Sequence, residues 1–117
     1  MAEKISRDTA RHYSWKEVCD GWHLMERDTL SVIAERMPPG TREDMHCHRH
    51  AAQFFYLLSG RAVMRLAQGE ETLLPGQGLE VPPMEAHQMT NPFSEDAEFL
   101  VISSPKAHGD KICMESL

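Results

Sequence analysis

Cysteine is scarce in this sequence, and the few cysteines do not pair. The 117 residues include three cysteines, Cys19, Cys47 and Cys113, and no two of them form a CxxC spacing. An odd number of separated cysteines fits a reducing compartment better than it fits a disulfide framework. We therefore expect free thiols and a cytoplasmic location.

Long hydrophobic runs are also absent. The longest candidates are "FFYLL" at 54–58 and "FLVIS" at 99–103, whereas a helix needs about 20 apolar residues to span a bilayer. Segment 1–18 has no apolar stretch followed by a small-residue cleavage site, so we expect no secretory signal. Both absences argue against a membrane partner.

The sequence lacks a basic cluster. It has 12 Lys and Arg against 18 Asp and Glu, which gives a formal charge of −6. Nucleic acids and anionic membranes are bound through basic patches that displace counterions, so we expect neither as a partner. Small molecules and proteins remain as candidates. The length suits one ordinary domain, and we predict that residues 1–117 form it.

Short apolar and β-branched segments alternate with turn signals along most of the chain. "FFYLL" precedes "SGR", "AVMRLA" precedes "QGEE", and the longer run at 23–37 ends at "PPG". This rhythm is typical of an antiparallel all-β sandwich or barrel. Near the start, "SWKE" at 14–17 predicts a short capped helix, and an irregular lead-in is the alternative.

The stretch "MHCHRHAAQFFYLLSG" at 45–60 crowds three histidines into five positions. Residues two apart on a strand project from one face, so His46 and His48 can present two imidazoles to one point while Cys47 faces away. An imidazole pair needs further donors to complete a metal shell. Gln53 and His87 are the candidates downstream.

Two spaced motifs then resemble a known family. Gly40, His46, His48, Gln53 and Gly60 have the spacing of the first cupin motif, at about 40–60. A second set of residues, at about 76–91, resembles the second cupin motif in its spacing: Gly76, Pro82, Met84, His87 and Asn91. The resemblance implies a small single-domain cupin, whose fold is a double-stranded β-helix, a jelly-roll barrel.

The resemblance also implies site residues. His46, His48 and His87 occupy metal-ligand positions, and Gln53 stands where the family usually has a glutamate. Gln53 is either a ligand or a hydrogen-bonding pocket residue. Met84 stands where glycine is usual, so that its loop is either shaped differently or brings the thioether near the pocket.

A neutral amide in place of a carboxylate changes the expected chemistry. Three imidazoles and an amide leave a divalent transition metal ion (Fe, Mn, Ni or Zn) with its full charge, so we expect weaker metal binding and a stronger Lewis acid. Such a site favours a carboxylate, an enolate or a vicinal hydroxyl pair. The expected ligand is a small, oxygen-rich organic molecule.

Strand alternation predicts the walls of the pocket. If Gln53 faces inward, Phe55 and Leu57 face inward too. On the last long strand, either the odd-numbered or the even-numbered residues of 99–104 face the cavity. Relatives with three histidines and one glutamine include small cupins that linearise unsaturated uronates, and alignment with them through "ISSP" implies Val101 and Ser103 as pocket residues. The acid and the arginine of such a reaction are not evident in the sequence.

Three functions follow from this interpretation. The first is a metalloenzyme that performs isomerisation, ring opening or elimination, with His50, Glu85, His108 and a metal-bound water as candidate proton carriers. The second is an Fe(II)-dependent dioxygenase, and the third is a non-catalytic cupin that binds a small molecule. A homodimer is also expected, because a small barrel leaves sheet edges and N-terminal aromatic residues exposed.

Overall fold

The protein is built from β-strands arranged in two sheets. The computed structural model describes residues 1–113, and these residues contain strands and turns but no helix. It follows that this part of the chain has no helix long and apolar enough to cross a membrane. The strands are β1 (Arg11–Trp15), β2 (Cys19–Glu26), β3 (Ser31–Met37), β4 (His46–His48), β5 (Ala52–Ser59), β6 (Ala62–Leu66), β7 (Gly69–Leu73), β8 (Gly78–Val81), β9 (His87–Thr90), β10 (Ala97–Ser104) and β11 (Lys111–Cys113).

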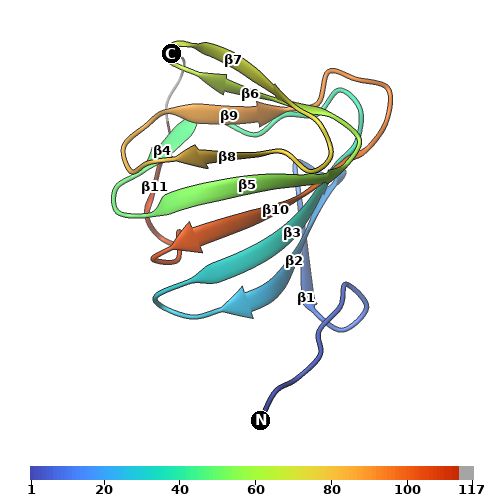
Figure 1. Ribbon diagram of the computed structural model, residues 1–117, viewed down its shortest axis with the longest axis vertical. Coiled ribbons are helices and arrows are strands. Elements are labelled where there is room, and N and C mark those ends of the chain that lie inside the picture. Colours follow the sequence, from blue (N-terminus) through green and yellow to red (C-terminus); the bar gives the residue numbers. More distant parts are fainter. Residues whose placement is uncertain (114–117) are drawn as a thin grey trace.

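Strands distant in the sequence pair side by side. One sheet has six strands in the order β1-β2-β3-β10-β5-β8, and the other has five in the order β11-β4-β9-β6-β7. The two sheets lie against each other, and β1 to β3 extend the larger one beyond the smaller (Figure 1). The predicted all-β jelly-roll architecture is confirmed.

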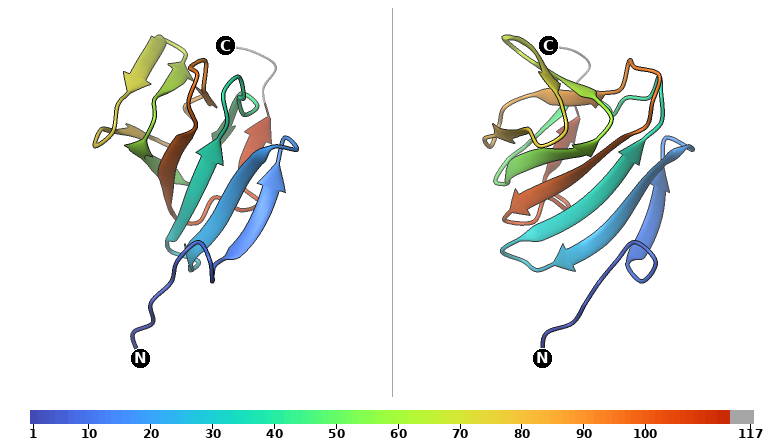
Figure 2. Two further views of the ribbon diagram at one scale, coloured as in Figure 1. Left: turned by 90° about the vertical axis from the view of Figure 1, so that its right-hand side faces the viewer. Right: turned by 45° about the vertical axis from the view of Figure 1, so that its right-hand side comes forward.

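The start of the chain differs from one of the two expectations. The helix predicted at 14–17 is wrong, because Ser14 and Trp15 belong to β1 and pair with Asp20 and Cys19 of β2. The turn that joins the strands holds Lys16 and Glu17 at φ 49° and 67°, outside the helical region. Residues 1–10 form an irregular lead-in whose first part extends away from the sheets (Figure 2), whereas Arg7 lies over the ring of Trp22 on β2. Pairing between strands therefore overrides a local capping signal.

The run at 23–37 proves to be two elements. It covers the end of β2 and all of β3, which are joined by a turn in which the Arg27 amide donates to the Leu30 carbonyl at 2.8 Å. In β3, Ser31, Ile33 and Glu35 face the interior of the barrel, where they line a cavity. This inward face of β3 therefore forms part of the cavity wall.

The apolar core fills the space between the sheets beside that cavity. Phe55 and Leu57 of β5 are buried, whereas Phe54 and Leu58 are exposed, as strand alternation predicts. Cys19 and Cys47 are buried free thiols, and the side chain of Cys113 lies outside the described residues. The core cluster consists of Cys19, Met37, Phe55, Leu57, Ala62, Met64, Leu73, Val81, Met89, Ala97, Phe99 and Val101.

Gly60 explains why the first motif ends in glycine. Its φ is +76°, and an added Cβ would lie 2.0 Å from the carbonyl oxygen of Asp96. Only glycine fits that position without moving backbone. This turn carries the chain from β5 in the six-stranded sheet to β6 in the five-stranded sheet.

Candidate metal centre and its cavity

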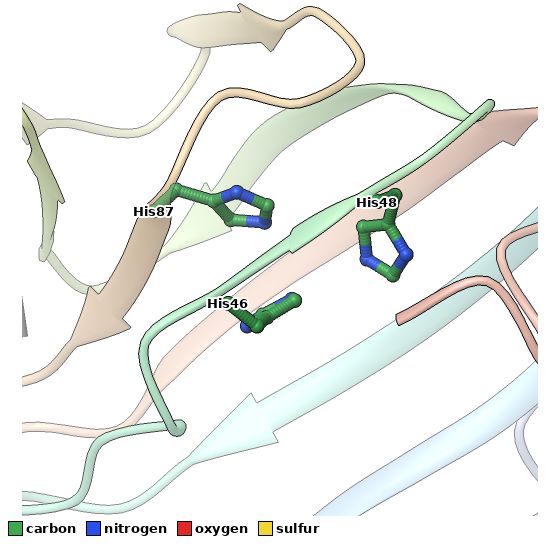
Figure 3. Close-up of side chains that lie close together, drawn as sticks. All are labelled: His46, His48 and His87. Carbon is green, nitrogen blue, oxygen red and sulfur yellow. The ribbon is translucent and has the colours of Figure 1, made fainter. Parts of the chain in front are cut away.

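The three motif histidines converge in the folded chain. His46 and His48 lie at the two ends of β4, and His87 opens β9 as the Cα partner of His46. All three are buried, and one ligand atom from each lies within 4.8 Å of the others. Figure 3 shows the three imidazoles gathered over the same space. The arrangement can hold a metal ion.

Backbone carbonyls orient two of the imidazoles. Nδ1 of His46 lies 2.7 Å from the Asp44 carbonyl, and Nδ1 of His87 lies 3.0 Å from the Glu85 carbonyl. A carbonyl only accepts, so Nδ1 carries the proton in both rings and Nε2 keeps its lone pair for a ligand. Nε2 of His87 is buried without a hydrogen-bond partner among the described residues. An unpaired buried nitrogen is costly unless something binds it.

Burial also keeps these imidazoles neutral. It lowers the pKa of His46 to about 3 and that of His48 to about 4, and it lowers the pKa of His87 as well. A neutral imidazole is the form that binds a metal ion. The site is therefore ready to bind a cation at neutral pH without first losing protons.

Gln53 approaches from the opposite sheet. Its Nε2 donates a hydrogen bond of 3.1 Å to Oγ of Ser103, its neighbour on β10. This bond orients the amide and leaves Oε1 buried with no partner in the described part of the chain. Gln53 therefore presents an oxygen acceptor without a partner to the cavity that His46 and His48 line.

A cavity of about 640 Å³ opens beside the histidines. The six-stranded sheet forms one wall, and β4 together with segment 106–111 forms the other. Phe55, Val101 and Ser103, the pocket residues suggested by the sequence, line this cavity, so the odd-numbered residues of β10 face inward. The predicted pocket residue Leu57 lies instead in the core, one step further along β5.

Met84 does not contribute to the cavity lining, so its placement as a pocket residue is corrected. Its side chain is 60% exposed, and its φ is +69°, the left-handed conformation for which glycine is better suited. The Met84 amide donates to the His48 carbonyl at 2.7 Å, which holds this turn against β4. The turn thus has a backbone conformation suited to glycine, and the thioether points outward.

The cavity contains polar groups that sequence reasoning missed. Tyr13, Glu35 and Glu43 line it together, although they come from β1, β3 and the segment before β4. The hydroxyl of Tyr13 donates to Oε2 of Glu35 at 2.9 Å, and the Met89 amide donates to Oε1 of Glu43 at 2.8 Å. Alternation along β3 would have placed Glu35 inward, but nothing local indicated that β3 lines the cavity.

Both carboxyl groups have unusual acidity. Burial raises the pKa of Glu35 to about 7, and burial together with the nearby Glu35 charge raises the pKa of Glu43 to about 8. Lys111 opposes both shifts. Carboxyl groups that titrate near neutral pH inside a cavity are candidates for moving protons.

The three side chains considered from the sequence as proton carriers occupy different places. His50 is exposed, in the bend between β4 and β5, and is not part of the cavity lining. Glu85 lies in the turn before β9, also outside the lining. His108 does line the cavity, at its rim, together with Arg11 and Lys106.

Comparison with known proteins assigns the family. The family model described as "Cupin domain" matches residues 34–103, which include both motifs. The chain belongs to the cupin family. Among curated proteins no match is found.

Solved cupin structures share the whole fold. KdgF from Halomonas sp. matches with a TM-score of 0.83 at 15% identity, over 92% of this chain and 97% of that one. The polyketide cyclase RemF from Streptomyces resistomycificus matches with a TM-score of 0.84 at 18% identity, over 97% and 86% of the two chains. A predicted oxalate decarboxylase from Thermotoga maritima matches with a TM-score of 0.80 at 16% identity, over 89% and 100%. These low identities show a common fold and leave the reaction open.

Proposed function

We propose that this cupin is a metalloenzyme that acts on a small, oxygen-rich organic molecule by isomerisation, ring opening or elimination. His46, His48, His87 and Gln53 hold a divalent transition metal ion, which is Fe, Mn, Ni or Zn. Phe55, Val101 and Ser103 form the wall against which the substrate rests. The substrate is anionic or hydroxylated.

One observation supports this proposal above the others. The three histidines bring their ring nitrogens together, and Gln53 lines the same cavity as His46 and His48. His48 Nδ1, His87 Nε2 and Gln53 Oε1 are each buried without a hydrogen-bond partner in the described residues. A protein that leaves such atoms unpaired loses stability, which a bound ion restores. A donor set of imidazole and amide suits a late first-row divalent ion.

The residues around this site can hold an organic molecule by its carbonyl or hydroxyl groups. A bound divalent ion would polarise a carbonyl or hydroxyl oxygen as a Lewis acid. Ser31 and Ser103 add hydroxyl groups to the polar end of the cavity, while Ile33, Phe55 and Val101 make its middle apolar. Apolar walls exclude water and strengthen the electrostatic interactions inside.

Metal content and turnover test this proposal together. The protein should be purified without added metal, analysed for elements, and assayed with each candidate ion on a panel of small hydroxy acids, keto acids and uronates. We expect near-stoichiometric binding of a divalent ion and turnover without consumption of oxygen. Turnover that needs iron and consumes oxygen would indicate a dioxygenase, and metal binding with no turnover on the panel would indicate a binding protein. Failure to bind any divalent ion would contradict the proposal.

Two structural neighbours support a small-molecule enzyme, since one is named a polyketide cyclase and the other a predicted oxalate decarboxylase. Small-molecule binding, a homodimer and a cytoplasmic location stay predictions for this chain.

A further inference from the structure

A tyrosine and a glutamate meet across a glycine on the inner face of the large sheet. Tyr13 of β1 is the Cα partner of Gly21 on β2, and Gly21 is the Cα partner of Glu35 on β3. The three residues therefore form one row across three strands. The Tyr13 side chain reaches across Gly21, and its hydroxyl donates to Oε2 of Glu35 at 2.9 Å.

Gly21 makes this contact possible. A Cβ added at Gly21 would lie 2.1 Å from Cζ and 2.5 Å from the hydroxyl oxygen of Tyr13. The Tyr13 ring thus occupies the space that any larger residue on β2 would fill. The φ of Gly21 is not in the left-handed region, so the close ring, and not the backbone, requires glycine here.

Glu35 is held at one oxygen and open at the other. Tyr13 occupies Oε2, and Oε1 has no hydrogen-bond partner in the described part of the chain. The charged groups that act on Glu35 from the elements around it are Glu43, on the segment before β4, and Lys111 on β11. Lys16 and Asp44 line a smaller adjoining cavity of about 310 Å³ that also includes Glu35.

The position of Glu35 relative to the metal centre follows from the strand registers. On β3, alternate residues point inward, in the order Glu35, Ile33 and Ser31. Ser31 is the Cα partner of Ser103 on β10, and Ser103 is in turn the Cα partner of Gln53 on β5. Glu35 thus lies at the opposite end of the same inner face, with an apolar step between the two polar ends. A ligand with oxygen atoms at the metal end and an extended body can reach both.

We propose that Glu35 is a catalytic residue of this cavity, a carboxyl group that removes a proton from a bound substrate and returns it, and that Tyr13, seated over Gly21, is its positioning residue. This inference rests on the proposed function, because it takes the cavity to be an active site. It names the proton carrier that an isomerisation or elimination needs.

The proposed step is a proton transfer with no other reactant. Oε1 of Glu35 forms an O–H bond with a proton from a C–H next to a carbonyl, and the C–H electron pair passes into an enolate. The same carboxyl then gives its proton to another substrate atom, and the carboxylate is restored. The raised pKa of Glu35, about 7, allows both forms to exist near neutral pH. The Tyr13 hydroxyl keeps its bond to Oε2 throughout.

Titration of the metal-free protein tests the Tyr13–Glu35 arrangement without any substrate. Carbon-13 NMR of the glutamate side-chain carboxyl carbons would be followed with pH in wild type, Glu35→Gln and Tyr13→Phe. We expect two glutamate carboxyls, those of Glu35 and Glu43, to titrate near neutral pH. The Glu35 signal is the one that is absent in Glu35→Gln, and it should titrate at higher pH in Tyr13→Phe, because the phenol hydrogen bond stabilises the carboxylate. A Glu35 pKa near the ordinary 4.5, or a Glu35 pKa that Tyr13→Phe leaves unchanged, would overturn the role of Tyr13.

Proton exchange tests catalysis in the zinc-loaded full chain. The probe is dihydroxyacetone in deuterated buffer, and the loss of its C–H signal is followed by proton NMR against free zinc ion. We expect wild type to exceed the free ion, Glu35→Gln to lower the rate by about 100-fold or more, and Tyr13→Phe to move the pH profile upward. Glu80→Gln is the matched control, since Glu80 is an exposed glutamate of the same sheet on β8.

Each result of the exchange experiment decides between the two proposals. Equal rates in wild type and Glu35→Gln, or no exchange by a wild type that holds zinc, would overturn Glu35 as the proton carrier and leave the metal site standing. A chain that holds no zinc would contradict the proposed function, whereas the metal-free titration would still decide the Tyr13–Glu35 arrangement. Nitrogen-15 correlation spectra of each variant would confirm that the fold is kept.

Discussion

His46 and His87 face each other as Cα partners where β4 meets β9, with their ring centroids 4.3 Å apart. This pairing joins the two motifs of the sequence into one site. His48 completes the group from the other end of β4, 5.0 Å from His46 between ring centroids. The histidines depend on strand pairing for their position, but the barrel core consists of other residues.

We therefore predict that His46→Ala or His87→Ala removes the bound metal and leaves the fold intact. The dissociation constant for zinc, measured by calorimetry, should rise at least 100-fold, while the melting temperature of the metal-free protein changes by about 5 °C or less. His50→Ala is the control, because His50 is exposed and lies outside the cavity lining. Unfolding of both variants would make these histidines structural.

Gln53→Glu should change metal and anion binding in opposite directions. The added negative charge should tighten zinc binding by about tenfold, which corresponds to about 1.4 kcal/mol. The gain should fade at acid pH, because the carboxylate becomes protonated. Binding of oxalate to the zinc-loaded protein should weaken. Calorimetry across pH would measure both, with the exposed Gln68→Glu as control. Unchanged metal affinity would place Gln53 outside the coordination shell.

Glu35→Gln should remove a pH dependence of stability. Because the pKa of Glu35 in the folded protein is about 7, above its ordinary 4.5, its contribution favours folding at low pH and is lost as pH rises from about 4.5 to about 7. Relative to the variant, wild type should lose up to about 3 kcal/mol over that range, at about 1.4 kcal/mol per pKa unit. Urea unfolding at several pH values, with a chelator present, would measure it. Parallel pH profiles of wild type and variant would contradict the prediction.

Gly21→Ala should act on Glu35 through Tyr13. The new methyl group would meet the Tyr13 ring at 2.1 Å, so the ring must move and its bond to Glu35 must break. We expect Gly21→Ala to raise the pKa of Glu35, as Tyr13→Phe does. In a Tyr13→Ser background, where the ring is gone, Gly21→Ala should have little further effect. Additive effects of the two changes would show that Gly21 acts independently of Tyr13.

The predicted homodimer has a candidate surface on the outer face of the six-stranded sheet. Ile102 pairs with Val32 on one side and with Phe54 on the other, and these partly exposed apolar side chains form a row across three strands. Such a face favours association. Ile102→Lys should produce a monomer at micromolar concentration by sedimentation, whereas Thr72→Lys on the other sheet should not. A wild type that sediments only as monomer would contradict the prediction.

Local sequence patterns accounted for much of the fold and for the histidines of the candidate metal centre. Strand alternation around Gln53 placed Phe55 and Leu57 on the inner face, and motif spacing picked the three histidines that converge. Such patterns are informative because side-chain direction in a strand is a local property of the backbone with a period of two. The "SWKE" prediction failed for the converse reason, since a weak capping signal was outweighed by pairing with β2.

Only the tertiary structure decided which residues share the cavity with the candidate metal centre. Tyr13, Glu35 and Glu43 lie far apart in the sequence, and their meeting depends on the register of β1 against β2 and of β2 against β3. The burial that raises the pKa of Glu35 also exists only after the sheets pack. Residue type and spacing specify which side of a strand a group occupies, but the neighbours of that group are set by long-range pairing, which no local pattern encodes.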